Sequence, residues 1–254
     1  MPAVTPRTLR SLLRRDLQAL SDRERALGMR RYMKSEMPYY GVASPDVKAI
    51  CKKRFADLHV ESFPQWETMV RYLWDTAAFR EERYCVLQLV GHKSGRLFQT
   101  PEALPLYEHL IVDGAWWDYV DDIASHRLGP ILLTHPREMK KAMRTWSRDD
   151  NMWKRRSAIL CQITLKERTD LKLLDDCIRP SIASREFFLR KAIGWALRSY
   201  AWTDLRFVEH YLKTHPKLSP LSQREALKNA VKLKTQPPGR GLSRSRLPRG
   251  LPAQ

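Results

Sequence analysis

The sequence predicts an all-helical protein built as a solenoid of stacked helices. Only 10 of its 254 residues are glycine, its hydrophobic runs are short, and helix-start signals recur along the whole chain. A hydrophobic content of 43% is enough for a substantial core. These observations together favour helices over a strand-rich fold.

The helix starts are of two kinds. In the first kind, a hydroxyl residue precedes a proline at the first helical turn, and in the second a serine is followed three residues later by Glu or Gln, as in a capping box. The first kind is found at Thr5-Pro6, Ser44-Pro45 and Thr100-Pro101, and the second at Ser21 and Glu24, Ser62 and Gln65, and Ser222 and Glu225. The predicted helices are 6–19, 22–34, 45–57, 64–74, 79–92, 101–112, 116–133, 137–146, 151–164, 170–178, 184–200, 203–213 and 222–234.

The predicted helices group into units of roughly 35–45 residues, a spacing that resembles degenerate HEAT or armadillo repeats. Stacked units of this kind form a superhelix with a concave face, which we expect to be basic. We assign residues 1–234 to this single domain. Residues 235–254 are rich in Pro, Gly and Arg and are expected to form a disordered tail.

The charge of the chain indicates a phosphate-rich partner. There are 46 Lys and Arg against 28 Asp and Glu, a net charge of +18, so nucleic acid is the first partner to consider, although solubility accounts for part of such an excess. The four cysteines form no CxxC pair, which disfavours a zinc site, and no apolar run is long enough to span a membrane. We expect reduced thiols, no cofactor, no metal, no membrane, a monomer and a cytoplasmic location, associated with the nucleoid when DNA is bound.

One segment suggests chemistry. Trp117 and Asp121 stand four residues apart in the string Trp116-Trp117-Asp118-Tyr119-Val120-Asp121-Asp122, so on a helix they project from one face. The apolar residues around them supply the opposite face. An indole beside a carboxylate suits a cationic ligand. A positively charged, alkylated base in DNA fits both this pair and the basic chain.

Several strings together resemble the AlkD-type DNA alkylation repair glycosylases. The resemblance covers about residues 7–234 and depends on the order and spacing of the strings rather than on any one of them. They are Arg31-Tyr32-Met33-Lys34, Leu73-Trp74-Asp75, Trp116-Trp117-Asp118-x-Val120-Asp121, Arg156-x-Ala158-Ile159-Leu160-x-Gln162, Glu186-Phe187-Phe188-x-x-Lys191-Ala192-Ile193-Gly194-Trp195-Ala196-Leu197-Arg198 and Pro220-Leu221-Ser222-x-Arg224-Glu225-Ala226.

The resemblance implies a HEAT-like superhelix that grips duplex DNA and hydrolyses the N-glycosidic bond of purines alkylated at N3 or N7. It further implies that the base can remain stacked during the reaction instead of being flipped. By the same resemblance, Asp121, Trp117 and Trp195 line the catalytic cleft, Arg156 holds DNA near the lesion, and Tyr32 lies at the cleft. No metal or cofactor is implied.

The chemistry of a cationic base agrees with this expectation. Such a base is already a good leaving group, so the general acid of an ordinary glycoside hydrolase is dispensable. Asp121 would stabilise the sugar cation and orient a water molecule. The rings of Trp117 and Trp195 would pack on the deoxyribose and favour its positive charge.

Basic residues at helical spacing are expected to bind DNA phosphates without reading sequence. In the run Lys154-Arg155-Arg156, at least two side chains are expected to face solvent. The predicted phosphate ligands are Arg156, Lys34, Lys48, Lys52, Lys191 and Arg198.

Other interpretations stay open. Each tryptophan could belong to the core, and Asp121 could be a solvated charge or an ion-pair partner. Asp118 and Asp122 could ligate a metal, which would suit a metal-dependent nuclease, but no histidine pattern supports this. The main alternative from another class is a non-catalytic HEAT-like protein that binds DNA or another partner.

Overall fold

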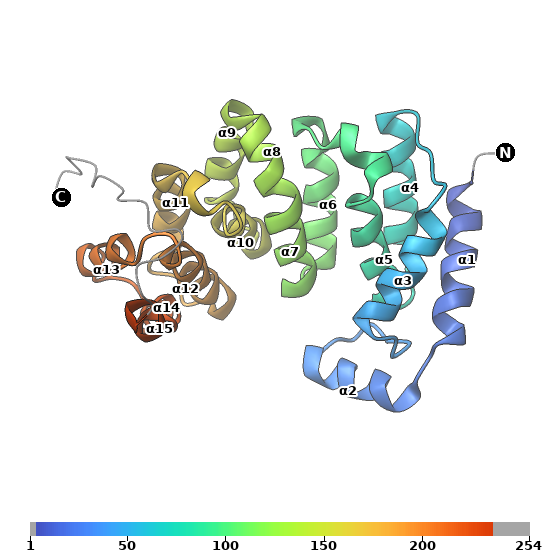
Figure 1. Cartoon of the computed structure of the whole chain (residues 1–254), viewed down its shortest axis with the longest axis horizontal. Coiled ribbons are helices and arrows are strands. Elements are labelled where there is room, and N and C mark those ends of the chain that lie inside the picture. Colours follow the sequence, from blue (N-terminus) through green and yellow to red (C-terminus); the bar gives the residue numbers. More distant parts are fainter. Residues whose placement is uncertain (1–3, 236–254) are drawn as a thin grey trace. The chain divides into compact units, whose positions relative to one another are not determined.

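The structure, a computed structural model, describes residues 4–235, and no strand occurs among them (Figure 1). This confirms the predicted all-helical class. The chain divides into two compact units, the first ending at Asp113 and the second beginning at Gly114. Apart from Thr235, the predicted tail at 235–254 lies outside the described residues, and the single-domain assignment of 1–234 stays a prediction.

Unit 1 is a stack of helices in which α1 packs against α3 and α4, and α5 packs against the same two helices. Leu9, Leu13 and Leu17 recur every four residues on α1 and are all buried, as an amphipathic helix requires. The unit consists of α1 (Pro6–Ala19), α2 (Arg23–Met33), α3 (Ser44–Phe55), α4 (Phe63–Asp75), α5 (Arg80–Val90), the 3-10 helices η1 (Lys93–Phe98) and η2 (Pro101–Ala103), and α6 (Leu104–Gly114), whose last residue belongs to unit 2.

Unit 2 is built around α10 and α12. The first of these contacts α7, α9, α11 and α12, and α12 also contacts α13 and α14. The unit consists of α7 (Trp117–Ile123), the π-helix η3 (Ala124–Leu128), α8 (Gly129–Thr134), α9 (Pro136–Trp146), α10 (Met152–Leu160), η4 (Lys166–Arg168), α11 (Leu171–Ile178), η5 (Arg179–Ser181), α12 (Phe187–Ala201), α13 (Leu205–Thr214), α14 (Pro220–Ala226) and α15 (Ala230–Thr235).

All thirteen predicted helices are present, but three of them are not continuous α-helices. The predicted helix 101–112 begins as the 3-10 helix η2 and continues as α6. The predicted helix 116–133 contains a wider π turn at Ala124–Leu128, directly after α7. The predicted helix 222–234 is divided into α14 and α15. Gly129 and Pro130 directly follow the π turn and mark this break in the sequence. Leu227, Lys228 and Asn229 separate the last two helices, so neither glycine nor proline marks the break between them.

The caps confirm part of the predicted helix-start chemistry. Thr5 Oγ1 accepts from Thr8 N at 3.1 Å, and Ser62 Oγ accepts from Gln65 N at 3.4 Å, as predicted. The capping box predicted at Ser21 is wrong, because Asp22 caps α2 by accepting from Arg25 N at 2.9 Å.

The other predicted starts differ from the structure in smaller ways. Ser44 is the first residue of α3 rather than its cap. Thr100 is the N-cap of the short η2 only, and its side chain accepts no capping hydrogen bond. The box predicted at Ser222 is also wrong, because Ser219 caps α14 and accepts from Ser222 N at 3.1 Å.

The helix α2 is held by the segment that follows it. Buried Glu81 accepts three backbone N–H groups of this segment, from Tyr40 at 3.0 Å, Gly41 at 2.8 Å and Val42 at 3.1 Å. Gly41 has a φ of 84° and packs so closely on the start of α2 that a side chain would collide with Asp22 O. The segment therefore fixes where α2 begins, although Met33 is the only residue of α2 that is buried.

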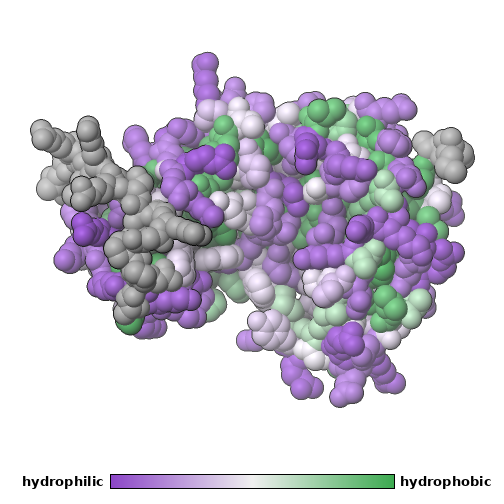
Figure 2. Space-filling model, viewed as in Figure 1, coloured by the Kyte–Doolittle hydropathy of each residue, from purple (hydrophilic) through white to green (hydrophobic). Residues whose placement is uncertain are grey.

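The surface in view in Figure 2 is mainly hydrophilic, with smaller hydrophobic patches between. All four cysteines are buried and none forms a disulfide, in line with the expected reduced thiols. No helix within residues 4–235 combines the length and the apolar character that crossing a bilayer requires.

Candidate active site

The helix α7 presents Trp117 and Asp121 one turn apart. Val120, Ile123 and the following Ala124 are 0% exposed and anchor this segment in the core. Trp117, the first residue of α7, is half-buried. Val120 is three positions after Trp117 and therefore lies on the same side of α7, so the expected separation of Trp117 from the apolar residues is wrong for Val120.

Asp121 forms an ion pair with Arg156 of α10. Arg156 Nε donates to Asp121 Oδ1 at 2.7 Å and Arg156 Nη2 donates to Oδ2 at 2.8 Å, so the guanidinium grips both carboxylate oxygens. A third bond runs from Arg156 Nη1 to the carbonyl oxygen of Phe188 at 2.6 Å. The side chain of Arg156 is only 5% exposed and that of Asp121 only 12%, so a nearly dry ion pair joins α7, α10 and the start of α12.

The ion pair controls the protonation of the carboxyl group. Burial raises the pKa of Asp121 above the ordinary value of 3.8, and the charge of Asp118 raises it further. The hydrogen bonds and the charge of Arg156 act in the opposite direction. Asp121 is therefore protonated at a higher pH than an exposed aspartate, and Arg156 is the group that favours its ionised form.

An aromatic cluster adjoins this ion pair, and none of its rings belongs to a predicted site residue. The ring centroid of Phe188 lies 5.6 Å from Trp116 and 5.0 Å from Trp153, and the guanidinium carbon of Arg156 lies 5.9 Å from it. Phe187, which is 52% exposed, meets Phe188 edge-on. The signal in the sequence was the pair of phenylalanines that opens α12, but the partners of Phe188 lie 32 or more residues earlier.

The run Lys154-Arg155-Arg156 does not face solvent as expected. Lys154 Nζ lies 2.5 Å from Asp149 Oδ2, and the Lys154 side chain is 11% exposed. Arg155 donates to Ser181 Oγ at 2.9 Å. With Arg156 bound to Asp121, every cation of the run has a protein partner, so the expectation of two solvent-facing side chains is wrong for Lys154 and Arg156.

Trp195 lies on α12, two turns after Phe188, and is half-buried. On the same face, Lys191 and Arg198 both bind Glu225 of α14, at 2.8 Å each. The two helices approach closely here, because a Cβ at Gly194 would lie 2.5 Å from Glu225 Cβ and 2.8 Å from Ser222 O. The role of Glu225 was missed because the local pattern predicted it as part of a helix cap.

The remaining predicted DNA ligands belong to unit 1. Tyr32 is 78% exposed near the end of α2, and Lys34, in the left-handed conformation with a φ of 48°, ends that helix. Lys48 and Lys52 stand one turn apart on α3 and are exposed. Within residues 4–235 none of these three lysines has a carboxylate partner, so all three amines can reach a ligand.

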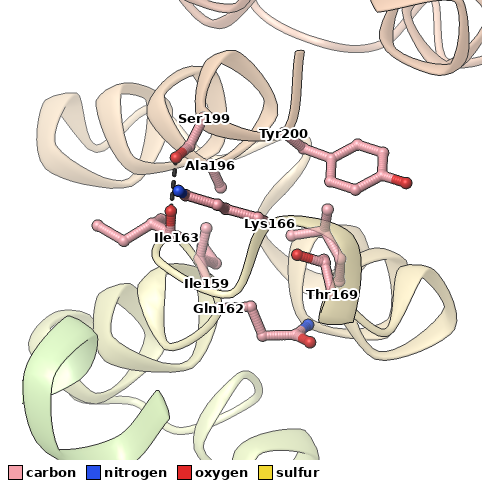
Figure 3. A pocket seen from close by; sticks show the side chains of 9 residues that line it. Ile159, Gln162, Ile163, Lys166, Thr169, Ala196, Ser199 and Tyr200 are labelled. Carbon is pink, nitrogen blue, oxygen red and sulfur yellow. Dashed lines mark hydrogen bonds between the residues drawn. The ribbon is translucent and has the colours of Figure 1, made fainter. Parts of the chain in front are cut away.

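A small hollow lies among α10, α12 and the loop between α10 and α11, and Figure 3 shows it. Its walls include Ile159, Ala196 and Tyr200, and a hydrogen bond of 2.6 Å from Ser199 Oγ to Ile163 O closes one side. It contains none of the predicted site residues. Among the described residues, no three His, Cys, Asp or Glu side chains come together as metal ligands.

Residues 13–230 match the family described as DNA alkylation repair enzyme. A solved structure, the predicted DNA alkylation repair enzyme from Enterococcus faecalis, is similar with a TM-score of 0.76 and 29% identity, and the match covers 84% of this chain and 97% of that one. No curated protein matches the chain.

Proposed function

Since the chain belongs to the DNA alkylation repair enzyme family, we propose that it is a DNA glycosylase. Its substrates are purines in duplex DNA that alkylation at N3 or N7 has made cationic, and it hydrolyses their N-glycosidic bond. The observation that carries the proposal is Asp121, a nearly buried carboxylate that is gripped by Arg156 and stands one helical turn after the half-buried Trp117.

The reaction needs one carboxylate and no acid. When the C1′–N bond breaks, its electron pair neutralises the cationic purine, which leaves without protonation. The deoxyribose becomes an oxocarbenium ion, which the negative charge of Asp121 stabilises, and a water molecule adds to C1′ and gives its proton to Asp121. A single carboxylate therefore performs the work that needs two in an ordinary glycosidase.

Arg156 acts through Asp121 in this proposal. Its two bonds occupy one position on each carboxylate oxygen, and a carboxylate offers about four acceptor positions in all. The remaining positions are sufficient for the sugar and the water. Arg156 also fixes the orientation of the carboxylate, so it is a positioning residue for the reaction rather than a phosphate ligand.

Two tryptophans complete the site. Trp117 and Trp195 are both half-buried, which leaves part of each ring available to a ligand. Their faces favour a cation in contact with them by about 0.5–2 kcal/mol each. Because the reaction needs no pocket that protonates or reads the base, the base can remain stacked in the duplex while the bond breaks.

The DNA is held by its backbone. Lys34, Lys48 and Lys52 are exposed amines, and Tyr32 adds an exposed ring on the same unit. Contacts of this kind are independent of sequence and weaken as salt rises. In unit 2 the candidate phosphate ligands are Lys191 and Arg198.

The test is release of free 7-methylguanine or 3-methyladenine from alkylated duplex DNA in the presence of EDTA. Asp121→Asn should lower the single-turnover rate by about 10²–10³, since it removes a charge worth roughly 3–4 kcal/mol to the transition state. The matched control is Asp122→Asn, which removes the same charge from the next residue of α7. Excision by Asp121→Asn at the wild-type rate, or an equal loss in both variants, would refute the proposal.

One observation favours a second candidate. An aspartate paired with a buried arginine is also a common structural arrangement, and a non-catalytic helical-repeat protein that binds DNA would contain it. That protein would bind alkylated duplex but release no base. A metal-dependent nuclease, by contrast, would cut strands only without EDTA. The assay run with and without EDTA, and scored for both free base and cut strands, therefore separates all three.

A further inference from the structure

Lys191 and Arg198 converge on a single carboxylate. Lys191 Nζ lies 2.8 Å from Glu225 Oε1, and Arg198 Nη1 donates to Glu225 Oε2 at 2.8 Å. The two cations stand two turns apart on α12, and Glu225 reaches them from α14. Each carboxylate oxygen thus receives one cation.

This arrangement is suited to an oxyanion other than the carboxylate. A DNA phosphodiester also offers two charged acceptor oxygens on one atom, and Lys and Arg are its usual ligands. Two positive charges face one negative charge here, so a single positive charge remains uncompensated. The side chain of Lys191 is 36% exposed and that of Arg198 is 22% exposed, which leaves both within reach of a ligand from solvent.

We propose that Lys191 and Arg198 bind one phosphate of the DNA backbone, and that Glu225 occupies this phosphate position in the free protein. When DNA binds, the phosphate displaces the carboxylate. The inference rests on the proposed function in taking duplex DNA as the ligand, but it requires no excision. Since Trp195 lies four residues after Lys191 and three before Arg198 on the same face of α12, the bound phosphate adjoins a ring of the candidate active site.

The Glu225 carboxylate is not required to hold α14 against α12. Ser222 Oγ donates to the carbonyl oxygen of Arg190 at 2.9 Å, and the two helices already touch at Gly194. These contacts hold α14 on α12 without the carboxylate. The consequence of Glu225 is electrostatic: it lowers the affinity for every DNA backbone alike, which limits retention on undamaged DNA.

The test compares two variants that remove the same charge from unit 2. Glu225→Gln removes the proposed phosphate substitute, whereas Glu209→Gln breaks a different pair, in which Lys234 Nζ lies 2.7 Å from Glu209 Oε1. The dissociation constant of each for an undamaged duplex is measured by fluorescence anisotropy over a range of salt. Glu225→Gln should bind roughly fivefold more tightly than wild type, since two partly exposed ion pairs no longer compete, and Glu209→Gln should change affinity by less than about twofold.

A double variant tests whether Lys191 and Arg198 are the cations that Glu225 competes for. When Lys191 and Arg198 are both replaced by Gln, binding should weaken, the slope of log affinity against log salt should fall by about 0.9, and adding Glu225→Gln should bring no gain. Unchanged or weaker binding by a Glu225→Gln protein that melts like wild type would overturn the proposal, as would an equal gain from Glu209→Gln.

If Glu225→Gln does not fold, the DNA affinity of Lys191→Gln tests the proposal instead. This variant keeps the ion pair between Arg198 and Glu225, so α14 remains paired with α12. Weaker binding with a lower salt slope supports the proposal, and unchanged binding overturns it. Excision of 7-methylguanine is scored separately, so a loss of excision leaves the binding result intact and the failure of one claim is distinguishable from the failure of the other.

Discussion

Replacing Arg156 by alanine should destabilise unit 2 strongly, which a surface phosphate ligand would not do. The guanidinium is nearly buried, with a side-chain exposure of 5%, and its three hydrogen bonds go to the two oxygens of Asp121 and to the carbonyl of Phe188. Arg156→Ala leaves a carboxylate that is 12% exposed without its counter-ion. Breaking a buried pair in this way costs about 3–5 kcal/mol.

The measurement is the free energy of unfolding from urea denaturation, followed by circular dichroism. The control is the double variant Asp121→Asn with Arg156→Met, which removes both charges and keeps much of the buried volume. It should lose less stability than Arg156→Ala, because no uncompensated charge remains. A free energy of unfolding within about 0.5 kcal/mol of wild type for Arg156→Ala would refute this reasoning and would favour the phosphate contact expected from the sequence.

The remaining predictions concern packing, pH and substrate range. Gly194→Ala should cost about 1–3 kcal/mol of unfolding free energy, because its Cβ would press on α14, whereas Gly28→Ala, with nothing within 4 Å, should be neutral or stabilising. Excision corrected for spontaneous depurination should fall on the acid side at a higher pH than an ordinary aspartate would give, since burial raises the pKa of Asp121 above 3.8, and a pH-independent rate would contradict the role of its ionised form. Trp117→Ala and Trp195→Ala should each slow excision of cationic lesions, by roughly 2- to 30-fold. Hypoxanthine should be left nearly untouched by the wild-type protein, and comparable release of hypoxanthine would reveal a proton donor.

The helices and the class of partner followed from the sequence because their signals are local. The predicted helix 6–19 coincides with α1, since Thr5 caps it and leucines recur at helical spacing within it. That Trp117 and Asp121 share one face of α7 was also predictable, because residues four positions apart on a helix are neighbours. The net charge of +18 needs no structure to indicate a polyanion.

Identical local patterns can nevertheless have different outcomes. Ser62 and Gln65 form the predicted start of α4, with Gln65 Oε1 accepting from the backbone N of Glu61 at 2.7 Å. Ser222 and Glu225 have the same spacing, yet Ser222 bonds to α12 and Glu225 binds two cations of that helix. The difference lies in which helix packs alongside, and that information is absent from a window of four residues.

The sequence by itself determined which segments are helical, which faces of them are apolar, and that the chain carries an indole and a carboxylate on one turn of a basic protein. Only the tertiary structure decided the partners of the charged groups. Asp121 and Arg156 are 35 residues apart, and an arginine beside Lys154 and Arg155 has the sequence pattern of a solvent-facing cation. Packing of α7 against α10 removes both groups from water, and a charge that loses its hydration must be paired, so burial converts an expected phosphate ligand into the ion-pair partner of Asp121.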